Sequence, residues 1–323
     1  MKTLVTGAAG FIGSTLSGRL LDAGAEVTGI DCFTDYYPRP IKEANLEALT
    51  GRRGFTFVEA SLQAADLGRL LDGVTHVFHL AAQAGVRRSW GRDFAIYTAL
   101  NVDSTQVLLE ACVGKPLHRL VYASSSSVYG AAESYPTTED MCPGPVSPYG
   151  VTKLAAEHLA QLYHRNHGLA TVSLRFFTVY GPRQRPDMAF HRFLKAARDG
   201  RPITVYGDGS QTRDFTYVAN VVDANLRALT AKGLRGQTVN VATGKRISLL
   251  DLHRELSREL GVRLAPERRP ARAGDIKHSQ AAIAAARRLL GYRPIVSFRD
   301  GVRLTAEWYR GQTVPHGRRR ARN

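Results

Sequence analysis

Cysteine is scarce in this chain of 323 residues, and the three cysteines lie far apart in the sequence. Cys32, Cys112 and Cys142 form no close pair, which argues against a disulfide framework and against a zinc site. Long apolar runs are also missing, since no segment approaches the roughly 18 consecutive apolar residues that a membrane-spanning helix needs. The first residues run directly into a strand pattern, without the apolar core of a signal peptide. We therefore expect a cytoplasmic protein with no bound metal and no membrane partner.

Acidic residues are few relative to basic ones, with 28 Asp and Glu against 44 Lys and Arg and a net charge of +16. Such an excess is typical of nucleic-acid-binding proteins. Much of it lies in the tail at 316–322 and around 268–269 and 287–288, and no nucleic-acid-binding motif accompanies it. We expect no nucleic-acid partner, because the charge also suits an anionic substrate with a diphosphate or reflects the codon usage of the host. RNA binding by the tail is the outside alternative.

The first half of the chain alternates short apolar runs with helical segments. This alternation predicts an α/β fold with a doubly wound parallel sheet of the Rossmann type. After residue 176 the rhythm changes, which predicts a smaller α/β lobe toward the C-terminus. The expected strands are 3–6, 26–30, 55–59, 76–80, 119–123, 171–176 and 238–241, and the expected helices are 13–23, 94–113, 148–167, 189–199, 218–231, 248–260, 280–290 and 299–309.

The change of rhythm also suggests how the chain divides into parts. We expect residues 1–176 to form a dinucleotide-binding domain, with a return segment near 214–241. Residues 177–213 and 242–312 are expected to form the substrate-binding lobe. Residues 313–323 are charged and lack apolar periodicity, so we expect a disordered basic tail.

Three glycines, Gly7, Gly10 and Gly13, follow the first expected strand and open the first expected helix. Glycine lets the backbone turn sharply and approach a pyrophosphate, which then lies at the positive end of the helix. The next strand ends at Asp31, whose carboxylate can accept a hydrogen bond from the adenosine ribose of a dinucleotide. A 2′-phosphate would be repelled there, so NAD is favoured over NADP. The alternative for Asp31, a solvated acid at a strand end, is much weaker given this spacing.

Tyr149 and Lys153 lie four residues apart at the start of an expected helix, so they share one face. The serine run at 124–127 ends the preceding strand, at the sheet edge where ligands bind. Lowering a tyrosine pKa from near 10 to ~7 requires about 4 kcal/mol of preferential stabilisation of the phenolate, which the Lys153 ammonium and a cationic nicotinamide could supply. Such a phenolate can take a proton from a sugar hydroxyl while a hydride leaves the same carbon.

These motifs resemble those of the extended short-chain dehydrogenases/reductases, in particular the NAD-dependent epimerase/dehydratase family, over the chain to about residue 310. The segments 79–82, 101–102, 213–215 and 272–275 add to the resemblance. Family members act on nucleotide-linked sugars and often pair as homodimers through two long helices, which implies a UDP-sugar substrate and a homodimer here. One departure is the segment 59–62, which lacks the aspartate that often meets the adenine.

The resemblance implies a role for each matching residue. Ser125 hydrogen-bonds the reacting hydroxyl, Tyr149 is the general base, and Lys153 also holds the nicotinamide ribose. Because of the departure after the third strand, the adenine contact would rely on backbone groups. The implied cofactor contacts are Gly7, Gly10, Phe11, Ile12, Gly13, Asp31, Ser61, Leu62, Leu80, Ala81, Ala82, Asn101, Tyr149 and Lys153.

By the same resemblance, Arg213 and Arg272 clamp the diphosphate of UDP and Asp275 binds the uridine ribose. Guanidinium groups suit phosphates because they bind them bidentately. Arg87 and Arg192 are further candidate substrate contacts. For each of these two alone, an exposed basic surface position is the better default in a chain so rich in arginine.

Residues 125–127 separate the possible reactions. Dehydratases of the family usually carry Thr-Asp-Glu there and UDP-glucuronate decarboxylases resemble Thr-Ser-Glu, whereas this chain has three serines. The segments 85–90, 175–181 and 183–188 are similar to those of UDP-glucuronate 4-epimerases. An NAD-dependent isomerase that converts UDP-glucuronate into UDP-galacturonate is therefore favoured. UDP-glucuronate decarboxylase, UDP-hexose 4-epimerase and a catalytically silent NAD-binding protein stay open as alternatives.

Uncharged hydroxyl groups near a uronate have a chemical purpose in such an isomerase. Oxidation at C4 of a glucuronate gives a β-keto acid, which loses carbon dioxide when its C5–C6 bond is perpendicular to the carbonyl plane. Ser126, Ser127 and Thr178 could hold the carboxylate away from that geometry without donating a proton to C5. Arg185 could pair with the carboxylate or with UDP, and the sequence does not separate these two roles.

Overall fold

A computed structural model describes residues 1–262, 265–270 and 276–312 of the chain. The expectations for Arg272, Asp275 and the tail at 313–323 fall outside the described residues. The strands of the main sheet are β1 (Lys2–Thr6), β2 (Glu26–Asp31), β3 (Phe55–Glu59), β4 (His76–His79), β5 (Arg119–Ser125), β6 (Thr171–Phe176) and β11 (Thr238–Val241).

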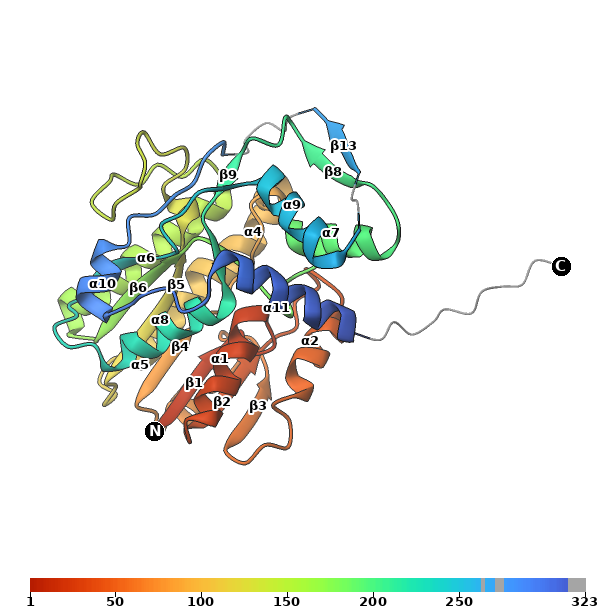
Figure 1. Cartoon of the computed structure of the whole chain (residues 1–323). Helices are drawn as coiled ribbons and strands as arrows, with labels where there is room; N and C mark the ends of the chain where they lie inside the picture. Colours follow the sequence, from red (N-terminus) through yellow and green to blue (C-terminus); the bar gives the residue numbers. More distant parts are fainter. Residues whose placement is uncertain (263–264, 271–275, 313–323) are drawn as a thin grey trace.

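These seven strands form one parallel sheet in the order β11-β6-β5-β4-β1-β2-β3 (Figure 1). They are the seven strands predicted from the sequence, and the doubly wound α/β fold is confirmed. The chain begins at β1, runs outward to β3 and then crosses to β4 on the other side of β1. The winding therefore reverses between β1 and β4, and ligands of open α/β sheets bind at the carboxyl ends of the strands beside such a reversal.

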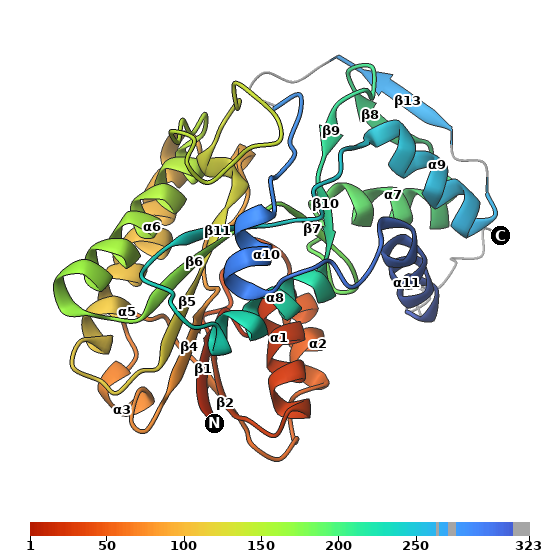
Figure 2. The same ribbon diagram turned by 60° about the vertical axis from the view of Figure 1, so that its left-hand side comes forward.

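Helices cover both faces of the sheet, which is why the inner strands are apolar on both sides. One long helix begins after Ser147, whose Oγ accepts a hydrogen bond from Gly150 N at 3.1 Å, and ends at Gly168 in the left-handed region. Figure 2 shows the two layers on opposite sides of the sheet. One layer holds α1 (Phe11–Asp22), α2 (Arg39–Glu47), α8 (Val218–Thr230) and α10 (Ala284–Leu290), and the other holds α3 (Leu67–Leu70), α4 (Phe94–Tyr97), α5 (Ser104–Cys112) and α6 (Pro148–His167).

Three helical segments differ from the sequence-based expectations. Helix α2 was not predicted; prolines stand at its start, a position in which proline is tolerated. The expected helix 94–113 is interrupted by a π-helical turn, Thr98–Asp103, between α4 and α5. The expected helix 280–290 begins only at Ala284. Residues 280–282 are held by Thr137, whose N–H donates to Gln280 O and whose O accepts from Ala282 N, both at 2.8 Å.

The remaining elements gather as a smaller lobe beside the sheet, at the upper right of Figure 2. Its helices pack on one another and on short two-stranded pairings, as expected for a small α/β lobe. Helix α10 instead packs on β11 and α8 of the main body. The exact division into domains stays a prediction. The elements of this part of the chain are α7 (Ala189–Arg198), α9 (Leu249–Leu260), α11 (Phe298–Gly311), β7 (Thr178–Tyr180) paired with β10 (Phe215–Tyr217), β8 (Ile203–Tyr206) paired with β13 (Pro266–Arg269), and β9 (Thr212–Arg213) paired with β12 (Ile247–Ser248).

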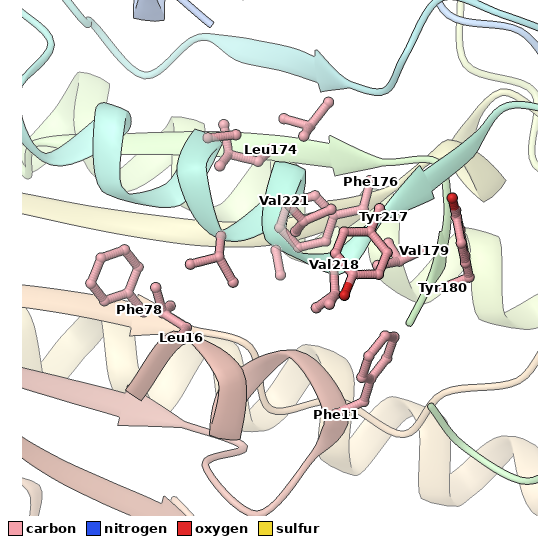
Figure 3. Packing of buried hydrophobic residues seen from close by; sticks show 14 of the residues in the cluster. Phe11, Leu16, Phe78, Leu174, Phe176, Val179, Tyr180, Tyr217, Val218 and Val221 are labelled. Carbon is pink, nitrogen blue, oxygen red and sulfur yellow. The ribbon is translucent and has the colours of Figure 1, made fainter. Parts of the chain in front are cut away.

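The largest apolar core lies between the sheet, α1 and α8 and continues into the lobe. Figure 3 shows Leu16 of α1 and Val221 of α8 among the side chains of the sheet, with Tyr180 and Tyr217 at the end nearer the lobe. The ring of Tyr180 stacks on Phe190 of α7 at 4.2 Å between centroids. Both parts of the chain are thus buried against each other through one continuous core. No helix within the described residues is long and apolar enough to cross a membrane.

His79, the last residue of β4, is buried with a hydrogen-bond partner on each ring nitrogen. Thr6 Oγ1 lies 2.8 Å from Nδ1, and Thr105 Oγ1 lies 2.9 Å from Nε2. Thr6 Oγ1 already accepts bonds from the N–H groups of Leu80 and Ala81. Its hydrogen is therefore left for Nδ1, and this network assigns the proton of the neutral ring to Nε2. His79 is a satisfied core histidine.

His79 should make the protein less stable in mild acid. Burial and the nearby charge of Lys153 lower the pKa of His79 to about 3, whereas an unfolded histidine titrates near 6.5. Below pH 6.5 the unfolded chain takes up a proton that the folded protein does not, so stability falls with pH. We expect the free energy of unfolding to fall between pH 7 and pH 5 by about 2 kcal/mol more in the parent protein than in His79→Gln. Urea denaturation at both pH values measures this difference, and equal losses would contradict it.

Candidate active site

A cavity of about 730 Å³ opens at the carboxyl ends of the sheet strands and reaches the smaller lobe. It brings together every predicted site residue that the structure describes, with the exception of Asn101. Sequence-distant elements therefore meet at one site, as expected for the edge of a doubly wound sheet. The predicted residues that line the cavity are Gly7, Gly10, Phe11, Ile12, Gly13, Asp31, Ser61, Leu62, Leu80, Ala81, Ala82, Arg87, Ser125, Ser126, Ser127, Tyr149, Lys153, Thr178, Arg185, Arg192 and Arg213.

The glycine turn between β1 and α1 is shaped for a close approach of backbone and ligand. Gly7 has φ +71°, and a Cβ there would lie 2.9 Å from Ala81 N. A Cβ at Gly13 would lie 2.1 Å from Gly7 O. Gly10 caps α1 without a side chain that could occupy the first N–H groups of the helix. These features fit a pyrophosphate at the positive end of α1.

Asp31 lies at the end of β2, where a ribose would meet it. Its Oδ2 accepts a hydrogen bond from Ala9 N at 3.2 Å and its Oδ1 accepts one from Phe33 N at 2.9 Å. Each oxygen keeps a second lone pair for a ribose hydroxyl. Lys42 of α2 also lines this part of the cavity, and its Nζ donates to Thr34 O at 2.8 Å. Burial lowers the pKa of Lys42 while Asp31 opposes that change, and the sequence reasoning missed this lysine together with its helix.

Asn101 lies behind the cavity wall rather than on it. Its Nδ2 donates to Gln83 O at 3.1 Å and to Thr152 Oγ1 at 2.9 Å, and its Oδ1 accepts from Gln83 N at 2.7 Å. Thr152 Oγ1 in turn donates to Tyr149 O at 2.9 Å. Asn101 thus ties the loop after β4 to the first turn of α6. The π-helical turn, of which Asn101 is part, puts its side chain in this position. Its direct contact with a cofactor stays a prediction.

Tyr149, Ser125 and Lys153 come together from β5 and α6. The side chain of Ser125 hydrogen-bonds the Tyr149 hydroxyl. Gly150 allows α6 to start this close to β5, because a Cβ there would lie 2.6 Å from Ser127 O. Lys153 Nζ lies 4.3 Å from the centre of the Tyr122 ring in a cation–π contact, and Lys153 lines the same cavity as Tyr149.

Burial shifts the pKa values of Tyr149 and Lys153 in opposite directions. Burial raises the pKa of Tyr149, and the hydrogen bond from Ser125 and the charge of Arg185 oppose that rise without reversing it. Burial also lowers the pKa of Lys153 to about 7, against the opposing charge of Glu157. These directions hold for the protein without cofactor, so the expectation that Lys153 and a cationic nicotinamide together bring the pKa of Tyr149 toward neutrality stays a prediction. Loss of water from the phenolate outweighs the fixed charges around it, so further positive charge has to come from what binds in the cavity.

The three hydroxyl residues expected near a uronate lie in the cavity with Tyr149. Ser126 and Ser127 begin the 3₁₀ turn after β5, and Ser127 N donates to Ser125 Oγ at 3.1 Å. Thr178 starts β7, and its N–H donates to Asp214 O at 3.1 Å. Both segments are thus fixed through backbone hydrogen bonds, which leaves their side-chain hydroxyls able to meet a ligand.

Arg185 reaches the cavity from the loop after β7 and is held by two residues that the sequence reasoning missed. Its Nε and Nη2 donate to the two oxygens of Asp187 at 3.0 and 3.1 Å. Tyr36, from the loop after β2, donates to Asp187 Oδ2 at 3.2 Å. The guanidinium charge also reaches Tyr149, because Arg185 partly offsets the rise that burial causes in the pKa of that tyrosine. No sequence pattern signals this grouping, since residues 36 and 187 are joined only by the fold.

Three further arginines mark the side of the cavity that faces the lobe. Arg213 Nη1 donates to Thr212 O at 2.8 Å. The guanidinium of Arg87 lies 6.0 Å from the centre of the Tyr206 ring across the cavity. Arg192 lines the cavity from α7. Their positive charge suits a diphosphate, and within the described residues no group of three or more His, Cys, Asp or Glu side chains could hold a metal ion.

Known proteins are similar to this chain in sequence and in fold. The model of the NAD dependent epimerase/dehydratase family matches residues 3–242. The crystal structure of UDP-glucuronic acid 4-epimerase from Bacillus cereus in complex with UDP-glucuronic acid and NAD is similar, with a TM-score of 0.93, 43% identity and coverage of 96% of this chain and 99% of that one. The uncharacterized UDP-glucose epimerase YtcB of Bacillus subtilis (strain 168) is 45% identical over 94% of this chain and 96% of its own length. UDP-glucuronate 4-epimerase 4 of Arabidopsis thaliana is 38% identical over 96% of this chain and 75% of its own length.

Proposed function

Because the chain belongs to the NAD-dependent epimerase/dehydratase family, we propose that it is an isomerase that inverts C4 of UDP-glucuronate to give UDP-galacturonate, with NAD as its cofactor. The reaction passes through a 4-keto sugar that keeps its carboxylate. One observation carries this proposal: the Ser125–Tyr149 hydrogen bond lies in the same cavity as Thr178 and Arg185. A base for the C4 hydroxyl and groups for a uronate carboxylate are thus combined in one place.

The residues of the chain divide the chemistry at C4 between them. Tyr149 accepts the proton of the C4 hydroxyl and later returns one to C4–O, and Ser125 holds that oxygen by a hydrogen bond. Lys153 supplies positive charge beside the phenolate. NAD, when bound, supplies the acceptor for the hydride that leaves C4 and gives it back to the opposite face of the ring. The glycine turn and Asp31 would hold the pyrophosphate and the adenosine ribose of this cofactor.

The carboxylate must be restrained while the 4-keto sugar exists. A β-keto acid loses carbon dioxide when its C5–C6 bond stands perpendicular to the carbonyl plane. Hydroxyls from Ser126, Ser127 and Thr178 can hold the carboxylate in another orientation, and none of them is an acid that could protonate C5. An ion pair with Asp187 holds Arg185 in the cavity wall. The positive charge of Arg185 can therefore pair with the same carboxylate or with UDP. Arg87, Arg192 and Arg213 are proposed to bind the diphosphate.

A homodimer and a cytoplasmic location complete the proposal. The outer face of α6 carries exposed Val151 and Leu162, and a shallow hollow beside them is lined by Leu159 and His158. Apolar residues on a helix face that is otherwise solvent-exposed favour pairing with a second copy. Sedimentation velocity measures the mass of the protein in solution, and a single species at the monomer mass of 35.4 kDa would contradict the homodimer.

A substrate comparison tests the reaction. The purified protein is incubated separately with UDP-glucuronate, UDP-glucose and UDP-N-acetylglucosamine, and products are identified by NMR. Formation of UDP-galacturonate without carbon dioxide supports the proposal. Turnover of UDP-glucose alone would replace it by UDP-hexose 4-epimerisation, the second candidate. The names of two relatives favour that candidate, YtcB and the UDP-glucose 4-epimerase of Mycolicibacterium smegmatis, which is 39% identical.

Thr178 should control how often the keto sugar loses its carboxylate. In Thr178→Ala the carboxylate loses one hydrogen-bond donor, so its C5–C6 bond reaches the perpendicular geometry more often. Because a hydrogen bond to a charged group contributes about 1.5–3 kcal/mol, we expect at least about tenfold more UDP-pentose per turnover than in the parent enzyme. NMR of the products and trapping of carbon dioxide measure this ratio.

Thr178→Ser is the matched control, because it keeps the hydroxyl and removes only a methyl group. Its product ratio should stay near that of the parent. If Thr178→Ala merely slows turnover while releasing no additional carbon dioxide, the proposed role of this threonine is wrong.

A further inference from the structure

A buried ion pair lies directly beneath the candidate active site. Glu157 of α6 and Arg175 of β6 have side chains that are 0% and 4% exposed. Arg175 Nη2 lies 2.6 Å from Glu157 Oε1, and Arg175 Nε lies 3.0 Å from Oε2. Two parallel hydrogen bonds of this kind fix both side chains in one orientation. The mechanism described above uses neither residue.

Further hydrogen bonds tie this pair to the strands that carry the site. Ser124, next to the catalytic Ser125 on β5, donates to Glu157 Oε2 at 2.6 Å. Arg175 Nη1 donates to the Tyr129 hydroxyl at 2.8 Å, and Tyr129 donates to Asn240 Oδ1 of β11 at 2.7 Å. Glu157 is therefore held from β5 and β6, and its carboxylate cannot turn away from its position on α6.

That position is one helical turn beyond Lys153, on the same face of α6. Lys153 is buried, and the groups that face it come from three elements: Tyr149 and Glu157 of α6, Tyr122 of β5, and His79 of β4. Burial raises the pKa of both tyrosines, and His79 is neutral because its pKa is lowered to about 3.

Of these groups, only Glu157 carries a negative charge at neutral pH. Arg175 of β6 is the nearest further charge in the network, and the charge of that arginine is matched within its own ion pair. Burial pulls the pKa of Lys153 down to about 7, and Glu157 opposes that fall. The state of the lysine at physiological pH therefore depends on this carboxylate.

We propose that Glu157 is a positioning residue for the catalytic lysine: held by Arg175 and Ser124, its carboxylate keeps Lys153 in the charged ammonium form that the Tyr149 phenolate requires. The role of the lysine rests on the proposed function, whereas the link between Glu157 and Lys153 rests on the buried network alone. Glu157 touches neither substrate nor cofactor in this assignment. It acts through Lys153.

Titration of Lys153 by NMR tests this directly. The chain has only eight lysines, so protein labelled with ¹³C at the lysine Cε positions and saturated with NAD gives few signals, and Lys153→Arg identifies the signal of residue 153. In Glu157→Gln we expect the titration midpoint of Lys153 to fall by about one pH unit or more, because an opposite charge nearby has been removed. Glu110→Gln, which removes a carboxylate from the neighbouring helix α5, is the matched control and should leave the midpoint in place.

Glu157→Gln leaves Arg175 buried without a partner and could fail to fold. The double variant Glu157→Gln/Arg175→Met removes both charges of the pair, so the Lys153 midpoint should again fall, but by less than in Glu157→Gln, which leaves the positive charge of Arg175 in place. Glu157→Asp keeps a carboxylate at this position, so its Lys153 midpoint should lie between those of Glu157→Gln and the parent protein. A Lys153 midpoint that does not move in the folded double variant overturns the proposal, because Glu157 would then have a structural role only.

The dependence of kcat on pH gives a second measurement. In the double variant the alkaline limb should move to lower pH together with the NMR midpoint, whereas a purely structural defect would lower kcat at every pH without moving the limb. The NMR titration needs no turnover. A protein that leaves UDP-glucuronate unchanged but shows the shifted midpoint would therefore refute the proposed function and leave the Glu157–Lys153 link standing.

Discussion

Tyr149→Phe is expected to slow epimerisation of UDP-glucuronate by at least about 10²-fold, the range in which loss of a general base falls. The substitution removes only the hydroxyl that Ser125 hydrogen-bonds. The ring keeps its edge-to-face contact with Tyr97, whose centroid lies 6.2 Å away, so packing should be preserved. Proton removal from C4–O then lacks the group proposed to accept the proton. Product formation followed by NMR, together with calorimetric titration of NAD, separates this loss of chemistry from a loss of binding.

Tyr163→Phe is the matched control for this loss. Tyr163 lies on the same helix, and its hydroxyl hydrogen-bonds Glu110 away from the cavity. The same removal of a hydroxyl should there leave both turnover and NAD affinity at the parent values. Substantial activity in Tyr149→Phe would exclude this tyrosine as the base.

The sequence predicted the sheet and the place of the site because both follow from short-range signals. Each strand is a local run of apolar residues, and the carboxyl ends of parallel strands necessarily meet at one edge. Gly7 directly follows β1, and Asp31 and Ser125 are the last residues of β2 and β5, so their position along the chain also determined their position in the cavity. The Tyr149–Lys153 spacing likewise fixes one helical face.

Contacts between distant segments could not be predicted in this way. Glu157 and Arg175 look like ordinary surface charges in the sequence, and only the packing of α6 on β6 makes them a buried pair. Lys42 and Asn45 were missed with α2, although Asn45 Nδ2 donates to Ala9 O at 2.9 Å and so braces the glycine turn. Polar residues inside a core carry no periodic signal that separates them from exposed ones.

The raised pKa of Tyr149 also depends on contacts between distant segments. A lysine close by in the sequence suggests a lowered tyrosine pKa. Burial, however, disfavours the charged form of each group, so it raises the pKa of Tyr149 and lowers the pKa of Lys153. The depth of burial is set by Tyr97 and Tyr122, which pack on the two side chains from other elements. The balance between charge and desolvation is therefore a property of the fold, and a spacing motif does not contain it.

Two glycine-to-alanine substitutions on the same helix should have opposite effects. In Gly13→Ala the new Cβ would lie 2.1 Å from Gly7 O and 2.8 Å from Gly7 C, atoms of the backbone turn that cannot rotate aside. The turn that would hold the pyrophosphate has to shift, so we expect a loss of about 1–3 kcal/mol in unfolding free energy. NAD binding should weaken at least about tenfold, since 1.4 kcal/mol corresponds to that factor.

Gly18→Ala makes the same chemical change five residues further along α1. Its Cβ would meet Leu49 Cδ2 at 3.7 Å and Arg52 Nη1 at 4.0 Å, both ordinary contacts. Alanine is the better helix former, so stability should rise by about 0.5–1 kcal/mol while NAD affinity stays unchanged. Urea denaturation without cofactor and calorimetric titration of NAD measure both variants side by side. If the two variants behaved alike, the close approach of α1 to the turn after β1 would not be what holds the dinucleotide, and the site would have to recognise NAD through Asp31 and the loops after β3 and β4 instead.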